Sequence, residues 1–207
     1  MDVLFPIHET FQATIQGEGA FVGTLVDFIR LYGCPVGCWF CDTGYSQTDD
    51  YGRTIPHTQY TIEQLLGELR SPRGVISGGE PMANRHLPLL VDAIENSDRH
   101  VSIETSGSRW QAISDTAWVT LSPKAHLNPK FPVMPTLWQR ANEIKLVISN
   151  GSELDFYQEP LTQVTHDIYL QPEWSDVQRT LPLTLQLLEK YPHYRLSVQL
   201  HKLIGVP

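Results

Sequence analysis

Residues 26–41 read VDFIRLYGCPVGCWFC, and the interpretation of the whole chain starts from this stretch. Val26–Leu31 is a β-rich run, which predicts a strand. Cys34, Cys38 and Cys41 follow within eight residues in the spacing C-x3-C-x2-C, and they are the only three cysteines among 207 residues. A [4Fe–4S] cluster is usually held by four thiolates. A cluster bound by this loop would therefore keep one iron without a cysteine ligand.

Three interpretations of the cysteines compete. Cysteine is common as a small core residue, but three cysteines in one glycine-containing loop are an unusual core pattern. Zinc would need a His or Asp as its fourth ligand, and the sequence lacks the second C-x2-C pair that is typical of structural zinc sites. The third interpretation is a [4Fe–4S] cluster with one open iron, at which a small molecule can bind.

Strand and helix patterns alternate along the chain. This alternation predicts βαβ units and a mostly parallel sheet. About six or seven strands are too few for a closed barrel of ~250 residues, so we expect an α/β fold with a partial, open β/α barrel in a single domain, residues 1–207. Further strands are expected at 74–77, 101–104, 118–121, 143–148, 167–170 and 196–200, and helices at 62–70 after the N-cap Thr61, at 87–96, and at 181–190 with Pro182 in its first turn and Leu181, Leu185 and Leu188 on one face.

Polar motifs stand where the predicted strands end. In parallel α/β folds the carboxyl ends of the strands form the ligand site. We therefore expect these motifs to share one pocket. They are the cysteine loop, Ser77-Gly78-Gly79-Glu80-Pro81, Glu104-Thr105-Ser106-Gly107, Ser122-Pro123-Lys124 and Gln171-Pro172.

Composition and charge exclude several classes of protein. The net charge of −8 and the lack of a basic stripe argue against a nucleic-acid binder. The first residues lack the pattern of a signal peptide, and no apolar run is long enough to span a bilayer. An odd, clustered set of cysteines is not a disulfide framework, so we expect a cytoplasmic protein.

The cysteine spacing, with Phe40 before the last cysteine and Gly78-Gly79-Glu80-Pro81 after the next strand, resembles the radical S-adenosylmethionine superfamily. The resemblance implies a [4Fe–4S] cluster with three cysteine ligands, whose open iron binds S-adenosylmethionine (SAM). Electron transfer then cleaves SAM to a radical that abstracts hydrogen from the substrate. The protein positions cofactor against substrate and excludes water.

Further segments resemble one family of that superfamily, the 7-carboxy-7-deazaguanine synthases. They are the run Glu9–Gly19 with its Q-G-E-G, Asp42-Thr43 directly after Cys41, Glu143-Ile144-Lys145, and Gln199-Leu200-His201-Lys202. The family converts 6-carboxy-5,6,7,8-tetrahydropterin to 7-carboxy-7-deazaguanine with loss of ammonia, using Mg2+, in 7-deazapurine (queuosine) biosynthesis. The resemblance also implies an electron donor such as a flavodoxin, and a homodimer.

The resemblance implies specific binding residues. The cluster ligands are Cys34, Cys38 and Cys41, and the Mg2+ ligand is Thr43. Thr43 could instead be the N-cap of a helix after the loop. The SAM site consists of Phe40, Cys41, Asp42, Gly79, Glu80, Ser122, Pro123, Lys124, Gln171 and Pro172. Glu80 could accept a bond from SAM or hold its loop, and Lys124 and Gln171 alone would be read as solvated surface residues.

The expected substrate residues are Ile15, Gln16, Gly17, Glu18, Arg30, Ser77, His201 and Pro207. Gln16 and Glu18 offer donors and acceptors to the pterin amide and amine. Arg30 offers a planar fork for a carboxylate, although a surface ion pair is its common alternative. His201, on an expected strand, could be a structural histidine. We expect the C-terminal segment to fold over the pocket, with the Pro207 carboxylate accepting from the pterin.

Two short motifs depart from the family pattern. Ser77 stands where the family has threonine, which keeps the hydroxyl, and Leu200 replaces the threonine of Q-T-H-K. Two other functions remain open: a glycyl-radical-activating enzyme, which shares the cysteine triplet and G-G-E-P, and an iron–sulfur or zinc-binding regulatory module. Neither explains the polar residues before the cysteine loop.

Overall fold

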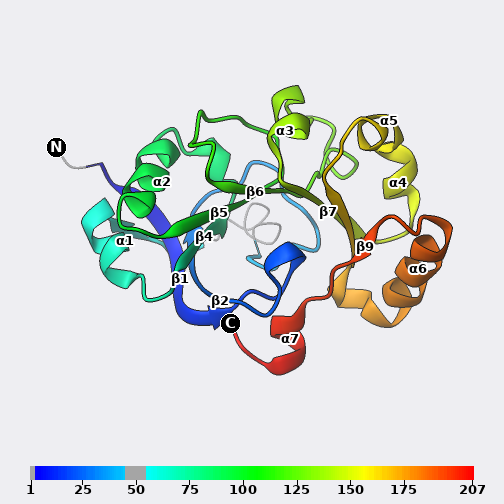
Figure 1. Ribbon diagram of the computed structural model, residues 1–207, viewed down its shortest axis with the longest axis horizontal. Helices are drawn as coiled ribbons and strands as arrows, with labels where there is room; N and C mark the ends of the chain where they lie inside the picture. The colour runs from blue at the N-terminus through cyan, green and yellow to red at the C-terminus, as the bar shows by residue number, and fades with distance from the viewer. Residues whose placement is uncertain (1–2, 45–54) are drawn as a thin grey trace.

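The computed structural model describes residues 3–44 and 55–207. In these residues the strands form one curved sheet in the order β3-β1-β2-β4-β5-β6-β7-β8-β9 (Figure 1). Neighbours from β2 to β9 are parallel, whereas β1 is antiparallel to β2 and β3, which confirms a partial, mostly parallel β/α barrel. The strands are β1 (Phe5–Ile15), β2 (Leu25–Leu31), β3 (Thr58–Tyr60), β4 (Arg73–Gly78), β5 (His100–Thr105), β6 (Trp118–Leu121), β7 (Glu143–Ile148), β8 (Asp167–Pro172) and β9 (Arg195–Leu196).

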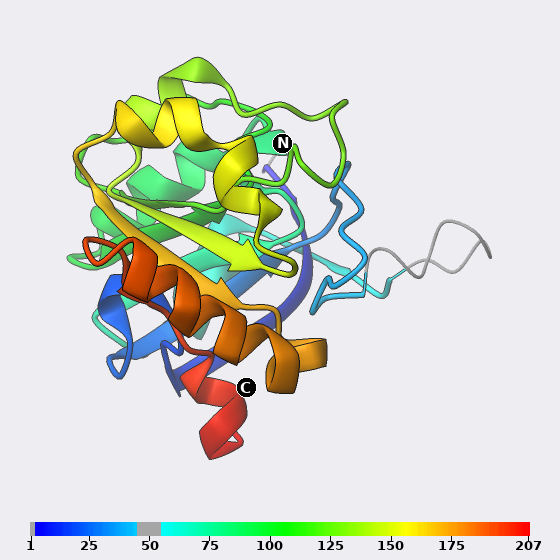
Figure 2. The same ribbon diagram turned by 90° about the vertical axis from the view of Figure 1, so that its right-hand side faces the viewer.

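Helices cover the convex side of the sheet, and the loop after β2 lies inside the curve (Figure 1). The last helix, α7, lies apart from the others and protrudes below the sheet (Figure 2). No helix in the described part of the chain is long and apolar enough to cross a membrane. The helices are α1 (Ile62–Glu68), α2 (Leu87–Glu95), α3 (Pro135–Arg140), α4 (Ser152–Phe156), α5 (Gln158–Thr162), α6 (Val177–Lys190) and α7 (Leu200–Ile204), with short 3-10 turns η1 (Gly19–Phe21), η4 (Pro81–Ala83) and η5 (Trp174–Asp176).

Two apolar cores lie between the sheet and these helices. The first packs β1, β2, β4 and β5 against α1 and α2, and the second packs β7 and β8 against α4, α5 and α6. Side chains alternate between the faces of a strand. On β7, Ile144 and Leu146 therefore enter the second core, while Lys145 and Val147 face the interior of the barrel. The helix-facing side is apolar and the inner side carries polar groups.

The loops that follow β2 and β4 meet through their backbones. The Gly79 N–H donates to the Leu31 carbonyl at 2.7 Å, and the Glu80 N–H donates to the Gly33 carbonyl at 2.9 Å. A side chain on Gly79 would collide with the backbone of Gly33, and Gly78 has a φ of +105° beside the Leu31 backbone. Glycine is required here because the two backbones are in direct contact.

The predicted strands at 26–31, 74–77, 101–104, 118–121, 143–148 and 167–170 agree with the structure within two residues at each end. The capping box that begins α1 confirms Thr61 as an N-cap, since Thr61 and Gln64 exchange hydrogen bonds. The sequence analysis missed β1 and β3. β1 lacks a regular apolar alternation, because its pairing with β2 is interrupted by two register shifts and Ala13 has a positive φ of 50°.

The predicted strand 196–200 is wrong. β9 ends at Leu196, and Leu200–Ile204 forms α7, so His201 lies on a helix. Short apolar runs do not separate strand from helix by periodicity alone. The chain therefore builds a further element near its end. This element, α7, contains His201 and Lys202, and Gly205 with a φ of 72° ends it.

The predicted start of α6 is also wrong. The helix begins at Val177, so Pro182 lies inside it rather than in its first turn. Leu185 is 44% exposed, whereas Thr180 and Thr184 are buried. Thr180 donates to the Glu173 carbonyl, which precedes η5, and Thr184 donates to the Thr180 carbonyl within α6, each at 2.7 Å. Because each of these hydroxyls donates to a nearby carbonyl, the two threonines can be buried. A search for apolar residues at helical spacing does not predict their burial.

We expect Asp27→Ala to lower the free energy of unfolding by about 3 kcal/mol, because it leaves buried donors without an acceptor. Asp27 is 1% exposed and accepts from the N–H groups of Ala13, Arg70 and Ser71 at 2.8, 2.7 and 2.6 Å. Urea denaturation measures the change. Asp92→Ala, on the exposed side of α2, is the control, and equal losses in the two variants would contradict this role of Asp27.

Candidate active site

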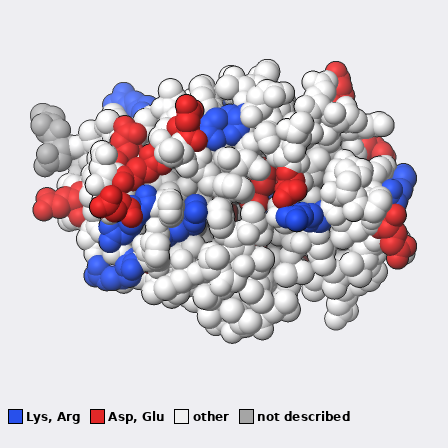
Figure 3. Space-filling model, in the orientation of Figure 1, with Lys and Arg blue, Asp and Glu red and all other residues white. Residues whose placement is uncertain are grey.

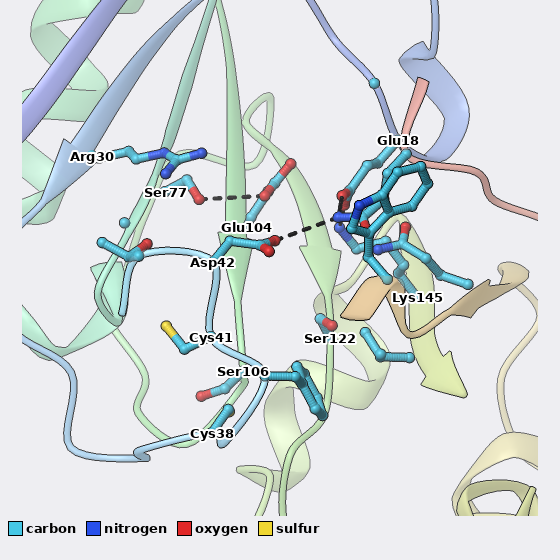
Figure 4. Close-up of a pocket in the computed structure, with 18 of the residues that line it drawn as sticks. Glu18, Arg30, Cys38, Cys41, Asp42, Ser77, Glu104, Ser106, Ser122 and Lys145 are labelled. Atoms are coloured by element: carbon cyan, nitrogen blue, oxygen red, sulfur yellow. Dashed lines mark hydrogen bonds and ion pairs between the residues drawn. The ribbon is translucent and has the colours of Figure 1, made fainter. Parts of the chain in front are cut away.

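One pocket occupies the inner face of the sheet, around the carboxyl ends of its strands. Residues of β1, β2, β4, β5, β7 and β8 line it, together with the cysteine loop and the C-terminal segment. Figure 4 shows Cys38 and Cys41 on one side of this pocket and Glu18 with Lys145 on the other. Every predicted site residue lines the pocket except Pro123, which is buried while its neighbours Ser122 and Lys124 take the pocket side. The expectation of one shared pocket is confirmed.

The three cysteines are free thiols of intermediate exposure that line this one pocket. Burial raises the pKa of the Cys34 thiol to about 11 and also raises the pKa of Cys38. Within residues 3–44 and 55–207, no three His, Cys, Asp or Glu side chains converge on a site for a single metal ion. The three thiols therefore line one common space, as the cysteine ligands of a single cluster would.

The Glu80 side chain joins its own loop after β4 to the end of β5. Its buried carboxylate accepts from the Thr105 hydroxyl at 2.5 Å, from the Ser106 N–H at 2.8 Å and from the Met82 N–H at 3.1 Å, and it also bonds the Ser106 hydroxyl. Holding the loop is one of the two roles that the sequence offered for Glu80. A contact of Glu80 with SAM stays a prediction.

Glu18 and Lys145 form a buried ion pair at the far side of the pocket, with side chains 12% and 7% exposed. Gln199 donates to the other oxygen of Glu18 at 2.7 Å. Burial by itself would raise the pKa of Glu18, but Lys145 and Gln199 hold that pKa well below its usual value. Burial likewise opposes the charge of Lys145, and Glu18 raises the pKa of Lys145 despite it. Both groups are charged at neutral pH.

A second carboxylate, Glu104, connects two predicted substrate residues. Gln16 donates to one of its oxygens at 3.2 Å. The Ser77 hydroxyl donates to the other at 3.3 Å (Figure 4). Glu104, on β5, thus orients both of these predicted side chains. Both contacts are long, so Gln16 and Ser77 retain capacity for a ligand.

The C-terminal segment closes one side of the pocket. Lys202 of α7 donates to Asp42 at 2.7 Å, next to Cys41. The Leu200 N–H donates to the Gly17 carbonyl at 3.0 Å, and a side chain on Gly17 would collide with the His201 ring. Pro207 accepts from the Thr14 hydroxyl at 3.0 Å and lines the pocket.

Arg30 has an ion-pair partner, as its alternative interpretation required. It donates to Glu9 at 3.0 Å and lies 5.1 Å from the centre of the Phe11 ring. Arg30 also lines the pocket, so its guanidinium is held at the pocket wall by two neighbours on β1. A planar fork in that position can still bind a carboxylate.

Lys124 and Gln171 are not solvated surface residues. Lys124 donates to the carbonyl and hydroxyl of Ser122 at 2.8 and 2.5 Å, and burial lowers its pKa to about 8. Gln171 is 4% exposed and accepts from the Ser197 hydroxyl at 2.9 Å. Thr43 lines the pocket, and the N-cap alternative is wrong, because Gly44, which would be the first residue of such a helix, has a φ of 77° and is not helical.

Sequence reasoning missed several residues of the site. Glu104, Lys145 and Gln199 lie in segments that it singled out but to which it gave no individual role, and the aromatic residues Phe11, Phe28 and Trp174 also line the pocket. The run Glu143-Ile144-Lys145 carries a usable signal. Two charges at positions i and i+2 of an otherwise apolar strand must share its inner face.

Comparison with known proteins identifies the class of protein. A family model described as the Radical SAM superfamily matches residues 28–124, which extend from β2 through the cysteine loop to Lys124. The chain therefore carries a radical SAM domain, and this family implies a [4Fe–4S] cluster and SAM as cofactors.

Relatives of full length define the family more closely. Proteins named 7-carboxy-7-deazaguanine synthase from Prochlorococcus marinus and Escherichia coli K12 are 33% and 32% identical, covering 100% and 98% of this chain and 100% and 99% of their own lengths. The crystal structure of QueE from Escherichia coli matches with a TM-score of 0.81 at 32% identity, over 96% of this chain and 95% of that one. The chain belongs to the 7-carboxy-7-deazaguanine synthase family.

We expect the stability difference between the wild type and Lys145→Met to depend on pH. A carboxyl whose pKa falls on folding adds stability above its unfolded pKa of about 4.3 and loses it as the pH falls through the folded value of about 2. In the variant, burial instead raises the folded pKa of Glu18. The difference should be about 3 kcal/mol at pH 7 and should shrink as the pH falls towards about 4.

Urea denaturation at several pH values measures this difference. Lys130→Met removes an exposed lysine and is the matched control, with no expected pH-dependent loss. A constant difference between pH 7 and pH 4 would mean that Lys145 does not control the charge of Glu18.

Proposed function

We propose that this chain converts 6-carboxy-5,6,7,8-tetrahydropterin to 7-carboxy-7-deazaguanine with release of ammonia, in 7-deazapurine (queuosine) biosynthesis. One observation carries the proposal: a single pocket contains the three cysteines, the residues of Q-G-E-G, Asp42-Thr43 and the chain end. The full-length similarity to 7-carboxy-7-deazaguanine synthases supports it.

In this proposal Cys34, Cys38 and Cys41 hold the [4Fe–4S] cluster, which with SAM supplies radical chemistry when bound. The raised thiol pKa values do not oppose this, because a bound metal displaces the proton of its thiolate ligand. In this proposal the ammonium group of Lys124 pairs with the carboxylate of SAM. Its amino group is held by Ser122 at the pocket wall.

The SAM site in this proposal extends along the carboxyl ends of β4, β6 and β8. The backbone of Gly79 lies at the pocket wall, where the methionyl amine of SAM can approach it. Phe40 and Asp42 flank the adenosyl group beside Cys41. Asp42 is fixed by Lys202 at 2.7 Å. The remaining residues of the site are Glu80, Gln171 and Pro172, all buried and lining the pocket.

The substrate is proposed to lie between Arg30 and the chain end. Arg30 binds its carboxylate, and Gln16 and Glu18 bind the polar edge of the pterin. Ile15 and Gly17 add backbone contacts, Ser77 a hydroxyl, and His201 and Pro207 close the far side. In the present arrangement Pro207 is bonded to Thr14, which keeps the chain end at the pocket.

Mg2+ is proposed to bind Thr43, with substrate oxygens supplying other ligands. Mg2+ prefers hard oxygen ligands and often keeps few from the protein. We further propose a homodimer in the cytoplasm that receives electrons from a donor such as a flavodoxin. The Mg2+ site, the homodimer and the electron donor rest on the family resemblance, and the cytoplasm rests on the odd, clustered set of cysteines.

The proposal predicts turnover. Reconstituted, reduced protein with SAM and Mg2+ should form 7-carboxy-7-deazaguanine from the carboxytetrahydropterin, as followed by chromatography and mass spectrometry. Metal analysis should find about four irons per chain. Cys38→Ala is the control and should lose both cluster and product. Cleavage of SAM by an intact cluster without this product would refute the assigned reaction and leave a radical enzyme of another kind.

We expect Thr43→Ala to retain the cluster and to weaken the Mg2+ dependence of turnover. Since Thr43 supplies one oxygen ligand, the Mg2+ concentration for half-maximal activity should rise by about tenfold. The measurement is a Mg2+ titration of the reconstituted enzyme, and Thr43→Ser, which keeps the hydroxyl, is the matched control. An unchanged Mg2+ response would remove Thr43 from the metal site.

A further inference from the structure

Lys145 is a buried cation in the pocket to which the proposed function gives no task. It lies in the middle of β7, 5% exposed, and its side chain points across the pocket wall to Glu18 (Figure 4). Taking an ammonium group out of water is costly unless it is paired. A cation in this position therefore needs a structural or functional reason.

The groups around Lys145 show which partner it serves. Three carboxylates act on it: Glu18 from the loop after β1, Glu104 from β5 and Glu143 from its own strand. Glu104 accepts from Gln16 and Ser77, and Glu143 accepts from the Thr120 hydroxyl at 2.7 Å and the Ala20 N–H at 2.8 Å. Glu18 is the one of these three that forms the ion pair with Lys145.

The charge of Glu18 depends on that pair. Burial favours its protonated form, and Lys145 is the largest influence in the opposite direction, with Gln199 and His201 contributing less. Lys124 also lies within electrostatic range of both partners. Without Lys145, Glu18 would bind a proton more readily and would present a hydroxyl in place of an acceptor oxygen.

Orientation follows from the same contacts. Lys145 binds one carboxylate oxygen of Glu18, and Gln199 donates to the other at 2.7 Å. Each carboxylate oxygen can accept more than one hydrogen bond, so both can still receive donors from a ligand. The aminopyrimidine edge of a pterin carries neighbouring N–H donors, which match an ionised carboxylate and not a protonated one.

We propose that Lys145 is a positioning residue that holds Glu18 as an ionised, oriented acceptor for the N–H donors of the substrate ring. This inference rests on the proposed function. Lys145 acts through Glu18 and does not itself bind the substrate. Its removal therefore affects substrate affinity only where Glu18 is present, and the loss grows as the pH falls.

The test measures binding of 6-carboxy-5,6,7,8-tetrahydropterin by calorimetry, with reconstituted protein and SAM but no reductant, between pH 6 and pH 9. Wild type should bind with little pH dependence from Glu18. Lys145→Met should bind about 10- to 100-fold more weakly, the range for a hydrogen bond to a charged group, with a larger loss at pH 6 than at pH 9. Lys145→Arg should restore part of the affinity, and Lys130→Met is the matched control.

A comparison of two Glu18 variants keeps the inference testable if Lys145→Met does not fold. Glu18→Gln and Glu18→Gln with Lys145→Met should bind the pterin equally, within about twofold, because Lys145 acts only through the charge of Glu18. A further tenfold loss in the double variant would overturn the inference, as would equal, pH-independent binding by wild type and Lys145→Met. If wild type does not bind the pterin at all, the proposed function fails before the role of Lys145 is reached.

Discussion

The cysteine loop is placed by a direct backbone contact between the loops after β2 and β4. Gly79 and Glu80 donate their N–H groups to the carbonyls of Leu31 and Gly33, and no side chain fits between Gly79 and Gly33. Glu80 then extends the contact to Thr105 and Ser106 at the end of β5. Three neighbouring strand ends are thereby joined, and the first cysteine follows immediately after Gly33. Backbone hydrogen bonds of this kind are rigid, which suits a loop that has to position several ligands.

The two faces of the sheet have different tasks. Its outer face packs apolar side chains against helices in two cores. Its inner face buries charged and polar groups, and each principal one has a partner: Glu18 with Lys145, Glu104 with Gln16 and Ser77, Lys124 with Ser122. The space-filling view shows acidic and basic side chains close to one another on the visible face of the molecule (Figure 3). Paired polar groups allow a ligand site at the centre of the fold without unpaired buried charge.

The C-terminal segment meets β1 and the cysteine loop at the pocket. α7 lies between the β1–β2 side and the β9 side of the curved sheet, which no strand pairing joins within the described residues (Figure 1). Lys202 reaches Asp42 beside Cys41, and Pro207 reaches Thr14 on β1. Residues separated by more than a hundred positions in the sequence therefore form one wall. The pocket is complete only when the C-terminal segment is docked.

Local patterns in the sequence determined the alternating strands, the mostly parallel sheet and the polar strand ends, because these depend on side-chain periodicity and on glycine and proline positions. Nearly every site residue that the cysteine spacing and the family motifs predicted lines the pocket. Tertiary structure alone decided how those residues are used. Periodicity could not distinguish α7 from a strand, find the bulged β1, or show that Thr180 and Thr184 are buried. The pairing of Glu18 with Lys145, 127 positions apart in sequence, arises only when the sheet curves and brings the loop after β1 over β7. Long-range contacts of this kind leave no local signature, since each partner alone resembles an ordinary charged residue.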